Sequence, residues 1–144
     1  MSHPHHHRAL SRSEVIELLR EHDVTPTQQR VEIGQAIFAG HQHFSADQLL
    51  ERLNGGGGNV SKATVYNTLG LFAQKGLVRE VVVDPSRLFY DSNLDPHHHF
   101  FHVDSGTLED VPAEAIGIER LPQIPQGAKI EGVDVIIRIK GAGR

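Results

Sequence analysis

The chain of 144 residues contains no cysteine. This absence excludes disulfides, thiolate zinc sites, iron–sulfur clusters and thiol redox sensing, so any metal must be held by nitrogen and oxygen. No apolar run approaches the roughly 20 residues that a membrane helix needs. The N-terminus, MSHPHHHRALSRSE, also lacks the apolar core of a signal peptide. We therefore expect a cytoplasmic protein.

Charge is distributed unevenly along the sequence. Apolar residues make up 38% and charged residues 22%, as in soluble globular proteins. Residues 1–83 contain eight Lys/Arg and eight Asp/Glu, whereas residues 84–144 contain six and ten. Neither part has the basic balance usual for nucleic-acid binding. The acidic second part is compatible with binding a cation.

Four helices are predicted in the first half. Ser11 and Ser45 each begin a capping-box pattern, with Glu or Gln three residues later. Thr25 is the expected cap of the second helix, with Pro26 in its first turn and an end near residue 40. The expected helices cover residues 11–22, 25–40, 45–54 and 61–75. Two strands should follow over residues 77–91, around a turn at residues 84–86. This layout is typical of a winged helix-turn-helix.

The second half is predicted to be a small sheet. We expect strands at residues 97–103 and 108–111, a short helix near 114–120 and a loop over 121–128. The segment IEGVDVIIRIK (130–140) has apolar residues at alternate positions, as a strand should. These few strands provide a thin core, which a homodimer would complete. The fold class is therefore α+β, with a small C-terminal α/β domain.

Residues 89–111, FYDSNLDPHHHFFHVDSGTLEDV, contain four of the eleven histidines together with four aspartates. They could form a metal site, a haem site or a polar strand. Because residues two apart share a face of a strand, His97 and His99 should point the same way. His98 should point to the opposite face, with Phe100 and His102.

Motifs along the chain resemble those of the ferric uptake regulator (Fur) family of metal-responsive bacterial repressors. TPTQQR, HFSADQL, SKATVYNTL and FYD…HHHFFH…GTLEDV occur in this order on the expected layout. ATVYNTL, HHHFF and GVDVIIRIK look most like the iron response regulator branch. The spacing of carboxylate and histidines also looks like that of the peroxide-sensing branch.

The resemblance implies a winged-helix DNA-binding domain at residues 1–90, a hinge at 91–96 and a dimerisation and metal-sensing domain at 97–144. A hinge metal would set the angle between the domains. Two departures are visible. The structural zinc that many members build from two CxxC pairs cannot exist here, since Ser105 precedes Gly106 and the tail has no cysteine. A second metal site of some members uses a histidine of the last strand, where this chain has Val133.

Ligands of the hinge metal are also implied by the resemblance. The implied ligands are three imidazoles and two carboxylates. Such a set suits Mn²⁺ or Fe²⁺, with Zn²⁺ binding in vitro. In the simpler interpretation, these are solvated histidines that bind adventitious zinc. Haem ligation by His97, His98 and His99 is the alternative implied by the iron response branch, and a solvated or supporting role is the other interpretation of His98. The five implied metal ligands are His43, Asp91, His97, His99 and Asp110.

The fourth helix is the expected recognition helix. Val65, Leu69, Leu71 and Phe72 are assigned to the core. An A·T-rich palindromic operator is expected, because tyrosine can contact a thymine methyl group and asparagine can pair with adenine. The predicted DNA-contacting residues are Arg30, Ser61, Lys62, Thr64, Tyr66 and Asn67.

The predicted function is therefore a metal-dependent, dimeric transcriptional repressor that responds to iron status, and not an enzyme. The alternatives are a haem-responsive or peroxide-sensing regulator, or a non-haem metalloenzyme, since three histidines with a carboxylate also occur in catalysts. No function is assigned to the N-terminal HPHHH.

Overall fold

The computed structural model describes residues 9–141, so the N-terminal HPHHH lies outside the described residues. The chain divides between Leu94 and Asp95 into two compact units. None of the helices among residues 9–141 has the length and apolar character that a membrane crossing requires.

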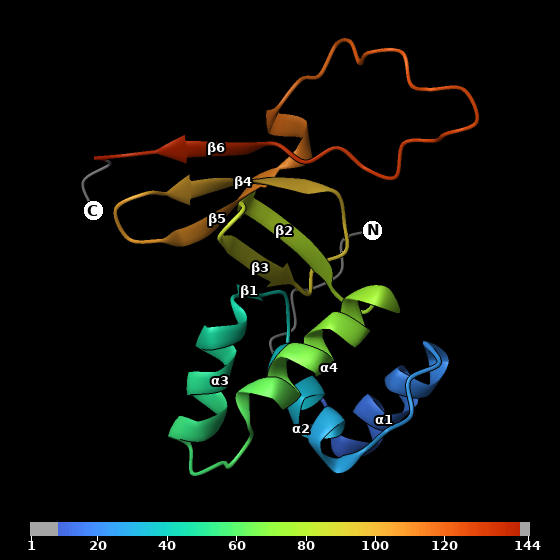
Figure 1. The fold of residues 1–144 in the computed structure, drawn as a ribbon, viewed down its shortest axis with the longest axis vertical. Helices are drawn as coiled ribbons and strands as arrows, with labels where there is room; N and C mark the ends of the chain where they lie inside the picture. The colour runs from blue at the N-terminus through green and yellow to red at the C-terminus, as the bar shows by residue number, and fades with distance from the viewer. Residues whose placement is uncertain (1–8, 142–144) are drawn as a thin grey trace. The chain divides into compact units, whose positions relative to one another are not determined.

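The first unit consists of four helices and a small antiparallel sheet (Figure 1). The strands lie in the order β1-β3-β2, and β2 and β3 form the expected hairpin. This arrangement confirms the predicted winged-helix layout. The elements are α1 (Arg12–Glu21), α2 (Gln28–Ile37), β1 (His43–Phe44), α3 (Ala46–Gly55), α4 (Lys62–Gln74), β2 (Arg79–Asp84) and β3 (Arg87–Asp91).

Helix starts follow the side chains that satisfy their first backbone N–H groups. Ser11 and Ser45 form the predicted capping boxes of α1 and α3. The prediction for α2 was wrong, because Thr27 and not Thr25 is the cap. The Thr27 hydroxyl accepts a hydrogen bond from the Arg30 N–H at 3.2 Å. The Thr25 carbonyl instead accepts from the Arg30 guanidinium at 2.9 Å, and Pro26 precedes the helix. The helix also ends at Ile37, earlier than expected.

The core of the first unit lies between the helices. Val65, Leu69 and Phe72 of α4 are fully buried as predicted, and Leu71 is half-buried against the same core. The spacing of Val65, Leu69 and Phe72 along α4 places these three on one helical face, which leaves the opposite face exposed. Other fully buried members of this core are Val15, Leu19, Ile33, Ile37 and Leu49.

The strand β1 was missed by the sequence analysis, since two residues carry no detectable alternation. It pairs antiparallel with β3, and His43 is the Cα partner of Asp91. Residues directly opposite each other on paired strands have side chains on the same face. The pairing therefore places two of the predicted ligands side by side within the first unit.

The second unit is a three-stranded sheet with β4 (His97–His102) at its centre. β5 (Thr107–Pro112) pairs antiparallel with β4, and β6 (Ile136–Ile139) pairs parallel with it. Two predictions were too long. β6 covers only four residues of 130–140, and these pair with the last four residues of β4, from His99 to His102. The predicted helix near 114–120 is a single 3₁₀ turn at Ala113–Ala115, since glycine follows two residues later and weakens helix.

Gly34 of α2 provides a test of helix packing. A Cβ atom at this position would lie 2.6 Å from Cγ1 of Val15 on α1. We expect Gly34→Ala to lower the free energy of unfolding by about 1–3 kcal/mol, as overpacking of a core does. Thermal and urea unfolding measure the change.

Gly70 is the matched control, because it is an exposed glycine in α4 whose added Cβ would meet nothing within 4 Å. Gly70→Ala should stabilise the protein by up to about 1 kcal/mol through helix propensity. Equal effects of the two substitutions would contradict the packing of α1 on α2.

Candidate metal centre

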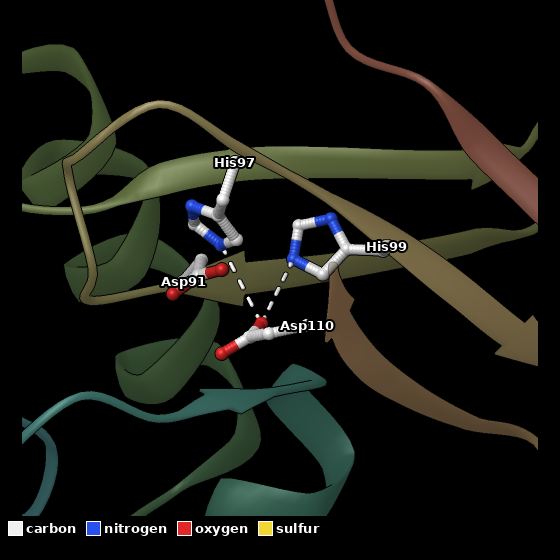
Figure 2. Close-up of side chains that lie close together, drawn as sticks. All are labelled: Asp91, His97, His99 and Asp110. Carbon is white, nitrogen blue, oxygen red and sulfur yellow. Dashed lines mark ion pairs between the residues drawn. The ribbon is translucent and has the colours of Figure 1, made fainter. Parts of the chain in front are cut away.

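Two imidazoles of β4 converge on one carboxylate of β5. His99 is the Cα partner of Asp110, and His97 lies two residues away on the same face. Nε2 of each histidine lies 3.5 Å from Oδ1 of Asp110, as the dashed lines in Figure 2 mark. The two rings meet edge to face with centroids 4.6 Å apart. The predicted shared face of His97 and His99 is therefore confirmed.

The Asp95 carbonyl fixes the tautomer of His97. Nδ1 of His97 lies 2.7 Å from this oxygen. A carbonyl can only accept, so Nδ1 carries the proton in this hydrogen bond. The lone pair of the neutral ring is then on Nε2, the nitrogen directed at Asp110. Support of this kind orients metal-binding histidines in proteins.

His98 has the opposite tautomer. The Val135 N–H donates to Nδ1 of His98 at 3.0 Å, so this nitrogen must carry the lone pair. Nε2 of the neutral ring is then protonated and cannot ligate an ion. His98 is also 7% exposed, which makes the solvated interpretation wrong. Its side chain ties the start of β6 to β4.

The three residues of the second unit suit a divalent cation. The ligand atoms of His97, His99 and Asp110 lie within 4.8 Å of one another. Two atoms bound to one ion at about 2.1 Å lie about 3.0 Å apart at an octahedral angle and about 3.4 Å apart at a tetrahedral one. The observed 3.5 Å is close to these separations and long for a strong hydrogen bond. Imidazole and carboxylate donors without thiolate match manganese, iron and zinc.

Burial differs among these donors. The His97 and His99 side chains are 6% and 1% exposed, whereas that of Asp110 is 50% exposed. The surroundings of the imidazoles therefore hold them in place, while the carboxylate stays accessible to an ion from solvent. The interpretation of both histidines as solvated residues on an open strand is wrong for this structure.

The remaining predicted ligands, His43 and Asp91, belong to the first unit. Asp91 is buried, and its Oδ1 accepts a hydrogen bond from the Asn93 N–H at 2.8 Å. His43 is half-buried on β1, opposite Asp91.

The predicted DNA-contacting residues occupy α4 and the start of α2. Lys62, Tyr66 and Asn67 are exposed. Ser61 is the cap of α4: its hydroxyl accepts from the Thr64 N–H and donates to the Thr64 hydroxyl. Phosphate contact by Ser61 would therefore compete with capping. Arg30 is half-buried, with its guanidinium on the Thr25 carbonyl.

Tyr66 has a partner that the sequence did not indicate. Its hydroxyl donates to Oδ1 of Asp47, in the first turn of α3, at 3.1 Å. Lys62 Nζ lies 5.6 Å from the centroid of the same ring. The hydrogen bond to Asp47, with smaller effects of burial and the carboxylate charge, raises the pKa of Tyr66. The phenol therefore stays protonated at neutral pH and presents a fixed ring.

Comparison with known proteins identifies the family. The model of the ferric uptake regulator family matches residues 21–138. A peroxide-responsive repressor, PerR, of Staphylococcus aureus is 33% identical over 111 residues, which are 76% of this chain and 75% of that protein. The chain belongs to the ferric uptake regulator family. Members of this family are metal-responsive, DNA-binding transcription regulators.

Solved structures agree with the Fur fold. The ferric uptake regulator of Pseudomonas aeruginosa with manganese has a TM-score of 0.65 and 23% identity, and the match covers 88% of this chain and 96% of that one. The Vibrio cholerae ferric uptake regulator has a TM-score of 0.65 and 19% identity, with coverage of 87% and 98%. These likenesses confirm the α+β fold, with a helical domain followed by a small α/β domain.

Substitution of neighbouring histidines tests the tautomers. His99→Ala should lower Mn²⁺ affinity about 10-fold or more, since a direct ligand should matter at least as much as a residue that orients one. His98→Asn should change it by less than about 3-fold, because the Asn oxygen can replace Nδ1 as acceptor for the Val135 N–H. Isothermal titration with Mn²⁺ measures both variants. Equal losses would refute the assignment of His98 as a structural residue.

Proposed function

We propose that the protein is a dimeric, metal-dependent repressor that responds to iron status. The observation that carries this proposal is the convergence of two Nε2 atoms, at His97 and His99, on the Asp110 carboxylate. In a family of metal-responsive regulators, such a site is the natural sensor. Because its ligands are nitrogen and oxygen, Mn²⁺ and Fe²⁺ are the proposed physiological ions, and Zn²⁺ would bind in vitro.

Asp91 and His43 complete the proposed ligand set. Asp91, which is buried in the first unit, would supply a second carboxylate. His43 would join through its pairing with Asp91 across β1 and β3. A bound divalent cation would supply a fixed positive charge that attracts both carboxylates. Since His43 and Asp91 belong to the first unit and the other three ligands to the second, shared ligation would favour one hinge angle.

The proposed target is A·T-rich palindromic DNA in the cytoplasm. Tyr66 and Asn67 present an aromatic ring and an amide on the exposed face of α4, suited to thymine and adenine. Lys62 adds a phosphate contact. A homodimer would present two such helices to the two half-sites. Its proposed interface is in the second unit, where Val133 and Ile137 are 39% and 38% exposed.

Mobility shift on an A·T-rich palindrome tests this function. Mn²⁺ should raise DNA affinity about 10-fold or more, which lies within the usual range for coupled sites, because it orders both reading helices before binding. A G·C-rich probe of equal length is the control, and sedimentation should give the mass of two chains. Loss of the Mn²⁺ effect, or equal binding of both probes, would overturn the proposal.

Peroxide sensing is the second candidate function, favoured by the 33% identity with a peroxide-responsive repressor. In this version, peroxide would oxidise a ligand histidine: a ring carbon exchanges its C–H bond for a C–O bond while the peroxide O–O bond breaks and water is released. The oxidised ring would then donate its lone pair poorly. Peptide mass spectrometry of the peroxide-treated Fe²⁺ form should find the added oxygen on His43 or His97. Its absence under conditions that abolish DNA binding would exclude this route.

Haem sensing through His97, His98 and His99 stays a prediction. The assigned tautomer of His98 and the burial of all three rings do not favour it. A haem ligand would need an accessible lone pair at one of these nitrogens.

A further inference from the structure

The side chain of Gln42 joins two helices of the first unit. Its Nε2 donates to the Ala36 carbonyl in the last turn of α2, at 3.1 Å. Its Oε1 accepts from Nη1 of Arg52 on α3, at 3.0 Å. Nη2 of Arg52 donates to the same Ala36 carbonyl at 3.0 Å, which closes a ring of three groups. The guanidinium thus uses two donors in a fork that a lysine could not reproduce.

The main chain of Gln42 is fastened on its other side to Ser92. The Ser92 N–H donates to the Gln42 carbonyl at 2.9 Å, and the Gln42 N–H donates to the Ser92 hydroxyl at 3.0 Å. This hydroxyl lies 3.2 Å from the Gly40 carbonyl, to which it can donate. We call the hydrogen bonds of Gln42 with Ser92, Ala36 and Arg52 the Gln42 joint. Gln42 precedes His43 and Ser92 follows Asp91, so this joint lies directly beside two proposed ligands.

The joint connects these ligands with the DNA-reading helix. Arg52 is on α3, which packs against α4 and hydrogen-bonds Tyr66 through Asp47. The chain of contacts from His43 runs through Gln42 and Arg52 to α3 and then to α4. The links from Gln42 to α3 and from α3 to α4 are hydrogen bonds made by Arg52 and by Asp47. Movement of β1 therefore requires either movement of α3 or loss of the ring.

A purely local role for Arg52 would be interaction with the C-terminal end of α3, where cations are favoured by about 0.3–1 kcal/mol. That role needs no contact outside α3. Both described hydrogen bonds of the guanidinium instead reach groups outside this helix. Charge-assisted hydrogen bonds of this kind are the stronger ones in proteins.

We infer that Gln42 and Arg52 are positioning residues that couple the metal site to DNA binding. The inference rests on the proposed function. When His43 and Asp91 gather around an ion, the Gln42 joint carries their position to α2 and α3, and thereby sets the orientation of α4. Neither residue binds the ion or the DNA. Their contribution is to the coupling between the two sites.

Arg52→Lys and Gln42→Ala test the inference in the full chain. Arg52→Lys keeps the positive charge and removes the forked guanidinium. Gln42→Ala removes both hydrogen bonds of the side-chain amide but keeps the main-chain hydrogen bonds to Ser92. Arg20→Lys is the matched control, since Arg20 is the basic residue in the last turn of α1. For each protein, Mn²⁺ affinity is measured by titration, and affinity for the A·T-rich palindrome is measured with and without Mn²⁺.

The expected result is a fall of at least about 5-fold in the Mn²⁺-induced gain of DNA affinity, a change of the size typical for coupling between sites. Mn²⁺ affinity without DNA and DNA affinity without Mn²⁺ should each stay within about 3-fold of the control, because the ligands and the reading residues are intact. The double variant should lose no more than either single variant, because both break the same ring.

An unchanged gain in both variants would overturn the inference, and the proposed function would stand. Equal losses with and without Mn²⁺, accompanied by a lower melting temperature, would show a merely structural role and would also overturn it. If the wild-type protein shows no Mn²⁺-dependent gain, the proposed function fails and the coupling role falls with it. The wild-type arm therefore separates the two failures.

Discussion

The candidate metal centre depends on the register between β4 and β5. Register places Asp110 opposite His99, and strand alternation places His97 on the same face, two residues away. A slip of β5 by one residue would turn Asp110 to the face opposite both histidines. His97 and His99 are both buried parts of β4 and candidate ligands, so the same pairing that folds the second unit assembles its site.

His97 and His98 have opposite tautomers and therefore different roles. The Asp95 carbonyl directs the His97 lone pair into the site, while the Val135 N–H uses the lone pair of His98 on the other side of the strand. His98 thereby helps to hold β6, together with the Asp104 carboxylate, which accepts from the Gly141 N–H at 2.9 Å. These bonds lie at the two ends of β6. In a chain without cysteine, these hydrogen bonds help to fasten the last strand without a disulfide.

Local rules predicted much of this structure. Capping boxes located α1 and α3, and alternation predicted the shared face of His97 and His99. Failures occurred where two local solutions compete or where partners are distant. Thr25 and Thr27 are both acceptable caps, and only the fold selects Thr27. The extent of β6 depends on its pairing with β4, more than thirty residues earlier in the chain, which no local pattern encodes. The tautomer of His98 has the same long-range origin.

Under the proposed function, hydrogen bonds within the first unit would let a small reading domain with balanced charge respond to a bound ion. Its Lys/Arg and Asp/Glu residues balance, so phosphate attraction alone gives modest affinity. Affinity must then depend on how the reading helices are oriented. The Tyr66 hydroxyl is hydrogen-bonded to Asp47 of α3. Arg52 of α3 is in turn hydrogen-bonded to Gln42, the residue before the strand that carries His43. The negative charge of Asp47 beside the exposed face of α4 would disfavour unselective phosphate binding, while its hydrogen bond keeps the Tyr66 ring in one orientation. Under the proposed function, weak electrostatic attraction combined with firm positioning would make DNA binding depend on the geometry of the metal site.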